Sequence, residues 1–180
     1  MSMSNRLVAT ASILALSAGV ALAAESANLG RIATPEEIGS YDISSDPDGT
    51  GLPPGNGTAK QGEAVYVAKC QPCHGEKGQN GTADRLVGGQ GTIADPTGTK
   101  RPIKTVGSFW PYATSVFAYI RRAMPFQESQ SLSNDELYAV TAYLLQLNGI
   151  IKEDEIVNAQ TLPKIQMPNR DGFFTAVKPN

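Results

Sequence analysis

Cys70, Cys73 and His74 are the residues of this chain whose types and spacing could do chemistry, within the run Cys-Gln-Pro-Cys-His. Two thiols three residues apart, followed directly by an imidazole, are the attachment sequence of a c-type haem. Each thiol can add to one vinyl group of the porphyrin, and the imidazole then lies under the iron as its proximal ligand. The chain has one histidine. The sequence therefore predicts one covalent haem c, attached at Cys70 and Cys73 and ligated by His74.

The same two thiols could instead form a redox dithiol, part of a zinc site or a disulfide. A thioredoxin-type dithiol should follow a strand and open a helix, whereas here residues 58–69 have a helical pattern and residues 75–91 are typical of a loop. A zinc site needs about four ligands, more than these adjacent residues supply. A disulfide closing so short a loop would stabilise the chain little. Haem is therefore favoured, with the redox dithiol and the disulfide as the alternatives.

The opposite face of the iron needs another ligand or stays open, because no second imidazole is present. Of the four methionines, two leave with a predicted signal peptide, so Met124 and Met167 are the candidates. Met124 lies in a short turn between two predicted helices, next to the stiffening Pro125. Met167 lies in a proline-containing tail without a helical pattern. We favour Met124 over Met167; an ordinary core methionine beside an open iron site is the third possibility.

Three helices are predicted to position these residues. The first covers residues 58–69, with Thr58 as its N-cap. The second covers residues 115–123 and ends in two arginines, where a helix C-terminus favours cations. The apolar residues assigned to the first helix are Ala64, Val65 and Ala68.

The third helix follows Ser133, which forms a predicted capping box with Glu136. Leu132 and Leu137 flank this box as a hydrophobic staple, and Asn148-Gly149 ends the helix. Its apolar stripe needs a partner, and helix 58–69 is the only comparable one distant in sequence. The stripe consists of Leu137, Val140, Leu144 and Leu147.

The segments between the helices are rich in turns. Residues 24–57 are polar and contain Asp-Pro and Pro-Gly turns, so we expect an arm that lies over a core. Residues 75–107 are rich in glycine, and so long a loop needs something to organise it, such as a buried porphyrin. An aromatic cluster follows, with Phe109, Trp110 and Tyr112 as its members; we expect it to act in packing, although it could also line the haem pocket.

The N-terminal segment has the pattern of a secretory signal peptide. Arg6 precedes an uncharged run rich in Leu, Ala and Val, and residues 21–23 offer the small side chains that a signal peptidase recognises. We expect residues 1–23 to be removed and the mature chain to be periplasmic, without a membrane span. A retained membrane anchor is the alternative, although residues 7–24 are at the short limit for a bilayer and are diluted by Ser, Thr and Gly.

Charge is unevenly distributed along a chain of formal net charge −2. Residues 69–122, which include the haem sequence, are locally basic, and both flanks are acidic. Such a basic patch could attract an acidic protein partner or offset haem propionates, or it is a solvated face without a partner. Nucleic acid is not expected as a partner, because the chain has a negative net charge. The patch includes Lys100, Arg101, Lys104, Arg121 and Arg122.

Residues 58–149 resemble the class I cytochromes c. The residues similar to that family are Gly62 and Tyr66 before the haem sequence, Met124 as axial methionine, and Tyr143-Leu144 in a last helix that crosses the first at its glycine. The resemblance implies an all-α fold of three to five helices around one covalent haem, with extended N- and C-terminal arms. It also implies iron ligation by His74 and Met124, and transfer of single electrons.

A closer resemblance takes in segments 30–38, 47–53, 101–112 and 164–173. Together they resemble the cytochrome subunit of bacterial periplasmic sulfite or sulfane dehydrogenases, whose partner subunit carries a molybdenum cofactor. This resemblance implies such a subunit as electron donor, and another cytochrome c or a terminal oxidase as acceptor. The related sulfane dehydrogenase subunit has two haems in a longer chain, whereas this chain has a single Cys-x-x-Cys-His. That difference favours a single-haem subunit or a stand-alone carrier.

The predicted organisation is a signal peptide at 1–23, an N-terminal arm at 24–57, a cytochrome c domain at 58–149 and a C-terminal arm at 150–180. We expect an electron-transfer protein that is not itself an enzyme, because no residue need act as acid, base or nucleophile. Two alternatives are a cytochrome partner of another periplasmic dehydrogenase, and a haem enzyme or gas sensor with an open sixth site. A peroxidase would need distal acid–base groups, and the chain has no distal histidine.

Overall fold

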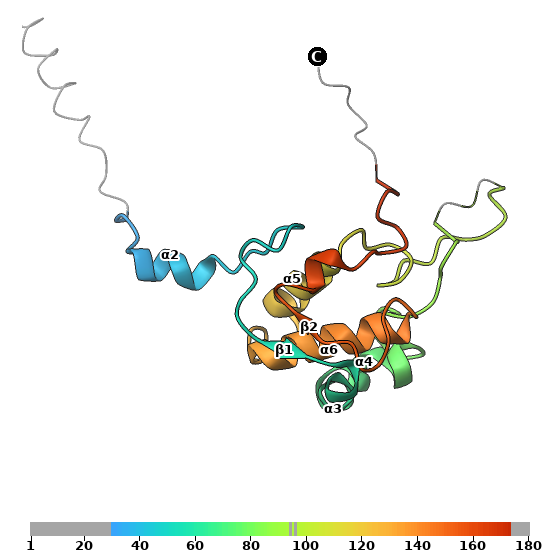
Figure 1. Cartoon of the computed structure of the whole chain (residues 1–180), viewed down its shortest axis with the longest axis horizontal. Helices are drawn as coiled ribbons and strands as arrows, with labels where there is room; N and C mark the ends of the chain where they lie inside the picture. The colour runs from blue at the N-terminus through green and yellow to red at the C-terminus, as the bar shows by residue number, and fades with distance from the viewer. Residues whose placement is uncertain (1–29, 94, 96, 174–180) are drawn as a thin grey trace, which may run out of the picture. The chain divides into compact units, whose positions relative to one another are not determined.

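The computed structural model describes residues 30–93, 95 and 97–173, so the signal peptide expected at 1–23 lies outside the described residues. The chain divides into two units, one ending at Tyr41 and one beginning at Asp42. Helices make up nearly all of the regular secondary structure in the described residues, in agreement with the predicted all-α class (Figure 1). The elements in chain order are α2 (Pro35–Tyr41), β1 (Asn56–Gly57), α3 (Ala59–Lys69), α4 (Gln71–His74), η1 (Glu76–Gly78), α5 (Ala113–Ala123), α6 (Asn134–Leu147), β2 (Val157–Asn158) and η2 (Leu162–Lys164).

Helices α3 and α6 cross at Gly62, which confirms the predicted partnership of these helices. A Cβ atom on Gly62 would lie 1.9 Å from the carbonyl oxygen of Ala139 and 2.9 Å from Cβ of Tyr143. Glycine is therefore required for the two backbones to come this close. One turn later, the rings of Tyr66 and Tyr143 pack with their centroids 5.3 Å apart.

Both helices begin at the predicted caps. The Thr58 hydroxyl accepts a hydrogen bond from the N–H of Gln61, and the Ser133 hydroxyl accepts one from the N–H of Glu136. In each case the third residue's side chain returns to the N-cap backbone, which completes the capping box. The predicted stripe of α6 is buried or half-buried, so these sequence signals located both helices correctly.

Two of the three apolar residues noted for α3 do not face the core, although Val65 packs against it. Ala64 and Ala68 are exposed and Val65 is half-buried, whereas Ala59 and Tyr66 face the core on either side of Gly62. The physical reason is that α3 meets α6 through its glycine, so the residue without a side chain fixes which face is buried. Counting apolar side chains could not reveal this face.

The segments that flank residues 58–149 pack together. Strands β1 and β2 pair antiparallel, with Gly57 opposite Val157, a ladder that the sequence did not predict. At the end of α5, which begins at Ala113 rather than at Ser115, Arg121 donates to the carbonyl of Ile43 and Arg122 to the hydroxyl of Ser44. Residues 42–57 are thereby held against the helices.

Asn148 ties the glycine-rich loop to the end of α6. Its amide nitrogen donates to the carbonyls of Leu86 (3.1 Å) and Leu144 (2.8 Å), and its Oδ1 accepts from the N–H of Gly88 (3.2 Å). The side chain is buried, with 8% exposure. Sequence analysis identified Asn148 only as a helix stop, but in the fold it organises the loop that follows the haem sequence.

We expect Gly62→Ala to lower the free energy of unfolding by about 3 kcal/mol, because the added methyl group cannot fit without moving the α6 backbone. Guanidinium chloride denaturation of the two proteins measures this difference. Gly39→Ala is the matched control, since a Cβ there meets nothing within 4 Å. Equal denaturation midpoints for Gly62→Ala and the wild type would contradict the close crossing.

Candidate haem site

Cys70, Cys73 and His74 lie together where α3 passes into α4. Cys70 is both the C-cap of α3 and the N-cap of α4, and its N–H donates to the carbonyl of Tyr66. The N–H groups of Cys73 and His74 both donate to the carbonyl of Cys70, at 3.2 and 2.9 Å. Pro72 fits the first turn of α4, where a backbone N–H is not needed. One short helical turn therefore presents both thiols and the imidazole.

The imidazole of His74 is oriented by a backbone carbonyl. Its Nδ1 lies 2.7 Å from the carbonyl oxygen of Asp84. Since a carbonyl can only accept, Nδ1 carries the proton and the lone pair of Nε2 is free. A neutral imidazole held in this way is the form that ligates a metal, so the donor set fits haem iron.

The two cysteines are free thiols, half-buried at Cys70 and exposed at Cys73. Burial, with a smaller effect of the Cys73 thiol, raises the pKa of Cys70 to about 11. The attacking thiol of a redox dithiol has a lowered pKa. The environment of Cys70 therefore disfavours the redox-dithiol alternative.

The turn after His74 is held from α3 by Tyr66. The Tyr66 side chain is fully buried, and its hydroxyl donates to the carbonyl of Gly75 at 2.8 Å. Gly75 has φ +77°, and a Cβ atom there would lie 1.9 Å from the carbonyl oxygen of Gln79. Sequence analysis assigned Tyr66 only to a family pattern; its position four residues before Cys70, one helical turn away, was the signal for this contact.

We expect Tyr66→Phe to lower the free energy of unfolding by about 1 kcal/mol below pH 10, because the Gly75 carbonyl loses its donor. Burial raises the pKa of Tyr66 from 10.0 to about 12 in the folded protein. The unfolded chain therefore loses this proton first, and the stabilisation declines as the pH rises from 10 to 12. Urea denaturation at both ends of that range measures the difference. Tyr41→Phe, at an exposed position, should behave as the wild type, and equal effects of the two variants would contradict this role.

The two candidate methionines lie in different surroundings. Met124 is the C-cap of α5, half-buried against the core, and its N–H donates to the carbonyl of Ile120. Met167 follows η2 and is part of the core, with 3% exposure. A buried methionine surrounded by apolar side chains is an ordinary packing residue. These surroundings favour Met124 as the ligand.

An ion pair joins the haem sequence to the turn that contains Met124. The Lys69 ammonium, directly before Cys70, lies 2.8 Å from the Glu128 carboxylate. The N–H of Glu128 in turn donates to the carbonyl of Pro125. The pair raises the pKa of Lys69 and lowers that of Glu128. It therefore links the two segments that carry the candidate iron ligands.

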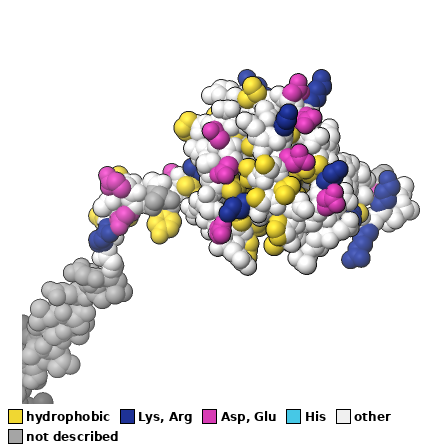
Figure 2. All heavy atoms as spheres, turned by 90° about the horizontal axis from the view of Figure 1, so that it is seen from below, with side chains coloured by type: hydrophobic (Ala, Val, Ile, Leu, Met, Phe, Trp, Pro, Cys, Tyr) yellow, Lys and Arg dark blue, Asp and Glu magenta, His cyan; other side chains and the backbone are white. Residues whose placement is uncertain are grey.

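The surface on the side of α3 has hydrophobic side chains gathered in its middle, with charged side chains around them (Figure 2). On α3 itself, Ala64, Val67 and Ala68 are exposed. In the predicted basic patch, Lys100, Arg101 and Lys104 are exposed. Arg121 is half-buried and donates to the carbonyl of Ile43. Arg122 is exposed as well and donates to the Ser44 hydroxyl, so the patch offers cations both in the loop before α5 and at the end of α5.

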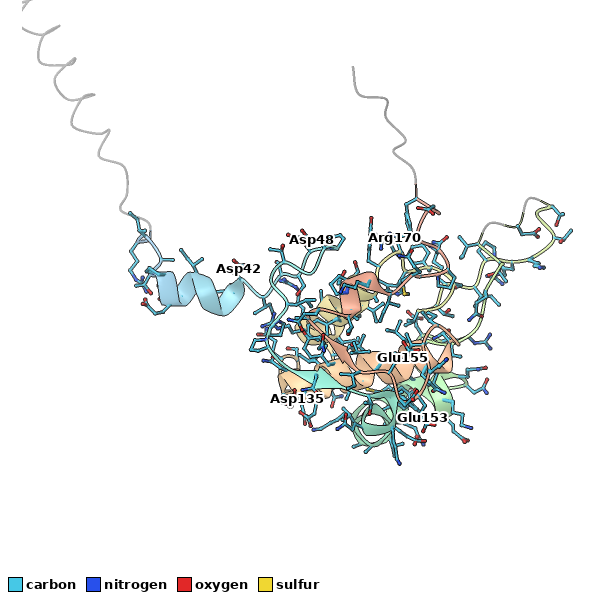
Figure 3. All side chains as sticks on the ribbon, viewed as in Figure 1. Asp42, Asp48, Asp135, Glu153, Glu155 and Arg170 are labelled. Atoms are coloured by element: carbon cyan, nitrogen blue, oxygen red, sulfur yellow. The ribbon has the colours of Figure 1, made fainter. Side chains whose placement is uncertain are left out.

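The predicted aromatic cluster is distributed over separate contacts. Phe109 packs edge-on against Phe173, with centroids 5.3 Å apart, and Trp110 packs against Tyr119 at 5.6 Å. Arg170, labelled in Figure 3, lies over the ring of Tyr112 at 4.2 Å. Phe109 and Tyr112 thus hold residues 170–173 against the segment before α5, and they act in packing.

In the part of the chain that the structure describes, no helix has the length and hydropathy needed to cross a lipid bilayer.

The comparisons with known proteins concern the family of the chain. The family model "Cytochrome C oxidase, cbb3-type, subunit III" matches residues 57–144. A chain in the crystal structure of the sulfane dehydrogenase SoxCD from Paracoccus pantotrophus is 41% identical, with a TM-score of 0.74. That match covers 83% of this chain and 72% of the SoxCD chain. No curated protein matches the chain significantly.

The helical fold and the Cys-x-x-Cys-His sequence, together with these matches, define a c-type cytochrome with the class I cytochrome c fold. The chain is thus a haem protein of electron transfer, as predicted. Within this family it is similar to a chain of the sulfane dehydrogenase SoxCD.

Proposed function

We propose that this protein is a periplasmic cytochrome c with one haem, which accepts single electrons from a molybdenum-cofactor dehydrogenase that oxidises sulfite or sulfane sulfur. The observation that carries the proposal is the 41% identity to a chain of the sulfane dehydrogenase SoxCD. One haem is inferred because the chain has two cysteines and one histidine, all in a single attachment sequence.

In this proposal four side chains of the chain hold the haem. Cys70 and Cys73 would hold the porphyrin, and Nε2 of His74 and the thioether of Met124 would bind the iron. Bound haem supplies reversible one-electron chemistry, and a methionine ligand raises its potential. The polypeptide contributes orientation: Asp84 fixes the imidazole, and Tyr66 fixes the turn beside it.

The role proposed for the chain is a relay and not catalysis. Its residues need not move protons or attack a substrate, since the dehydrogenase subunit would carry out the oxidation. Exposed Lys100, Arg101 and Lys104 would attract acidic partners, including the acceptor, for which we propose another cytochrome c or a terminal oxidase. We also propose export by a signal peptide at 1–23, with arms at 24–57 and 150–180 flanking the cytochrome domain at 58–149.

Stopped-flow reduction of the oxidised mature cytochrome tests this function. The cytochrome is mixed with the purified molybdenum subunit of the same host, with sulfite or a sulfane-sulfur compound as substrate. We expect rapid appearance of the reduced haem spectrum only when enzyme and substrate are both present. Reduction no faster than with substrate alone would reject the partner and leave a stand-alone carrier.

A further inference from the structure

Residues 30–41 are the first described part of the predicted N-terminal arm, and they alone are called the arm from here on. They carry exposed apolar side chains. Ile32 is 95% exposed, Ile38 55% and Tyr41 83%. The arm belongs to a compact unit separate from the one that begins at Asp42. Three large exposed apolar side chains within ten residues make this segment a candidate for an interaction surface.

Local contacts shape the arm into a helix before any partner is present. The N–H of Glu37 donates to the Thr34 hydroxyl at 3.3 Å, and the Glu37 carboxylate accepts from the N–H of Thr34 at 2.9 Å. This is a capping box, with Pro35 at the first helical position. The Arg31 guanidinium also pairs with the Glu37 carboxylate. A helix as short as α2 is nevertheless marginal in water, so these contacts preorganise a conformation that a partner surface would stabilise.

The arm region is shared with the sulfane dehydrogenase relative. The cytochrome family model covers residues 57–144 and so excludes the arm region. The match to the SoxCD chain covers 83% of this chain. Residues 57–180 alone make up a smaller fraction of the chain than this. The match therefore extends into the residues before Gly57, beyond what a cytochrome domain alone requires.

The contact area indicates which kind of partner the arm fits. Three large side chains can bury a few hundred Å² at most, far below the roughly 1,200–2,000 Å² of a stable interface. A second copy of the arm would not hold two chains together. Electron-transfer interfaces are small and weak, so a cytochrome that stays bound to its donor needs additional contacts. An arm that binds the same donor supplies them by raising the effective concentration.

Building on the function proposed above, we propose that residues 30–41 clamp the cytochrome to the molybdenum dehydrogenase subunit. Ile32, Ile38 and Tyr41 enter an apolar groove on that subunit. The arm contributes affinity, and the unit that begins at Asp42 contributes the electron transfer.

The test measures binding and reduction with the same pair of proteins. Ile38→Ser removes an arm side chain that is 55% exposed, and Ile156→Ser is the matched control at 58% exposure in the other unit. Isothermal titration of the mature holocytochrome with the purified molybdenum subunit gives Kd, and stopped-flow reduction gives the limiting rate. We expect Kd to rise about tenfold in Ile38→Ser, as for a central interface side chain. The limiting rate at saturation and the haem spectrum should not change, and Ile156→Ser should resemble the wild type.

Each other outcome overturns the clamp. An unchanged Kd in Ile38→Ser, with normal reduction of the wild type, rejects the arm while leaving the proposed function intact. Equal weakening by Ile38→Ser and Ile156→Ser rejects a specific role of the arm. A dimer of the wild type that Ile38→Ser abolishes assigns the arm to a second copy. Failure of the subunit to reduce the wild type rejects the proposed function and the clamp together.

Discussion

His74→Ala is expected to abolish the low-spin spectrum of a six-coordinate haem iron. The chain has one histidine, so no other imidazole can take its place. The variant also loses the contact with the Asp84 carbonyl that presents Nε2. Absorption spectra of the oxidised and reduced proteins measure the change, and added free imidazole should restore part of the spectrum by filling the space of the missing side chain.

Asp84→Ala is the matched control for His74→Ala. Its backbone carbonyl, and not its exposed side chain, accepts from the imidazole, so we expect the wild-type spectrum. An unaltered spectrum in His74→Ala would exclude His74 as a ligand. A change of equal size in both variants would show that the loop after the haem sequence was disturbed, and not the iron coordination.

The cap residues explain why most of the fold could be predicted. Helix caps depend on residues of one helical turn, so Thr58 as N-cap and the Ser133–Glu136 capping box located α3 and α6 without tertiary information. The haem sequence is equally local, since it lies within five consecutive residues. Features specified by neighbouring residues were therefore found from the sequence.

Features that depend on distant contacts were harder to predict. The crossing of α3 and α6 at Gly62 was expected only from the family resemblance, and the contacts by which Asn148 orders the glycine-rich loop were missed. The helix α2 was missed for another reason: its start signals, Thr34 and Pro35, lie in a segment whose many turn residues indicated an irregular arm. The prediction that Phe109, Trp110 and Tyr112 form one cluster was wrong, because their rings contact other residues. Two of these partners, Phe173 and Arg170, come from a distant segment of the chain.

Met124→Ala is expected to remove the methionine-to-iron charge-transfer band and to lower the midpoint potential by on the order of 0.1 V, part of the roughly 0.8 V over which axial ligands tune haem iron. The physical reason is that a thioether ligand favours reduced iron. The open coordination position should also let the reduced variant bind carbon monoxide rapidly, whereas the wild type binds it slowly. Redox titration and carbon monoxide mixing measure these changes.

Met167→Leu separates ligation from packing, because it keeps the volume of a side chain that is 3% exposed while removing the sulfur. If Met124 is the ligand, Met167→Leu retains the band and the potential, and its free energy of unfolding falls by less than about 1.5 kcal/mol. The half-buried place of Met124 at the end of α5, linked through the Lys69–Glu128 pair to the haem sequence, is the reason to expect this result.

Loss of the band in Met167→Leu but not in Met124→Ala would instead assign the ligand to the C-terminal segment. A band absent from the wild type itself would indicate an open iron site, and would favour a sensor or a haem enzyme over an electron carrier.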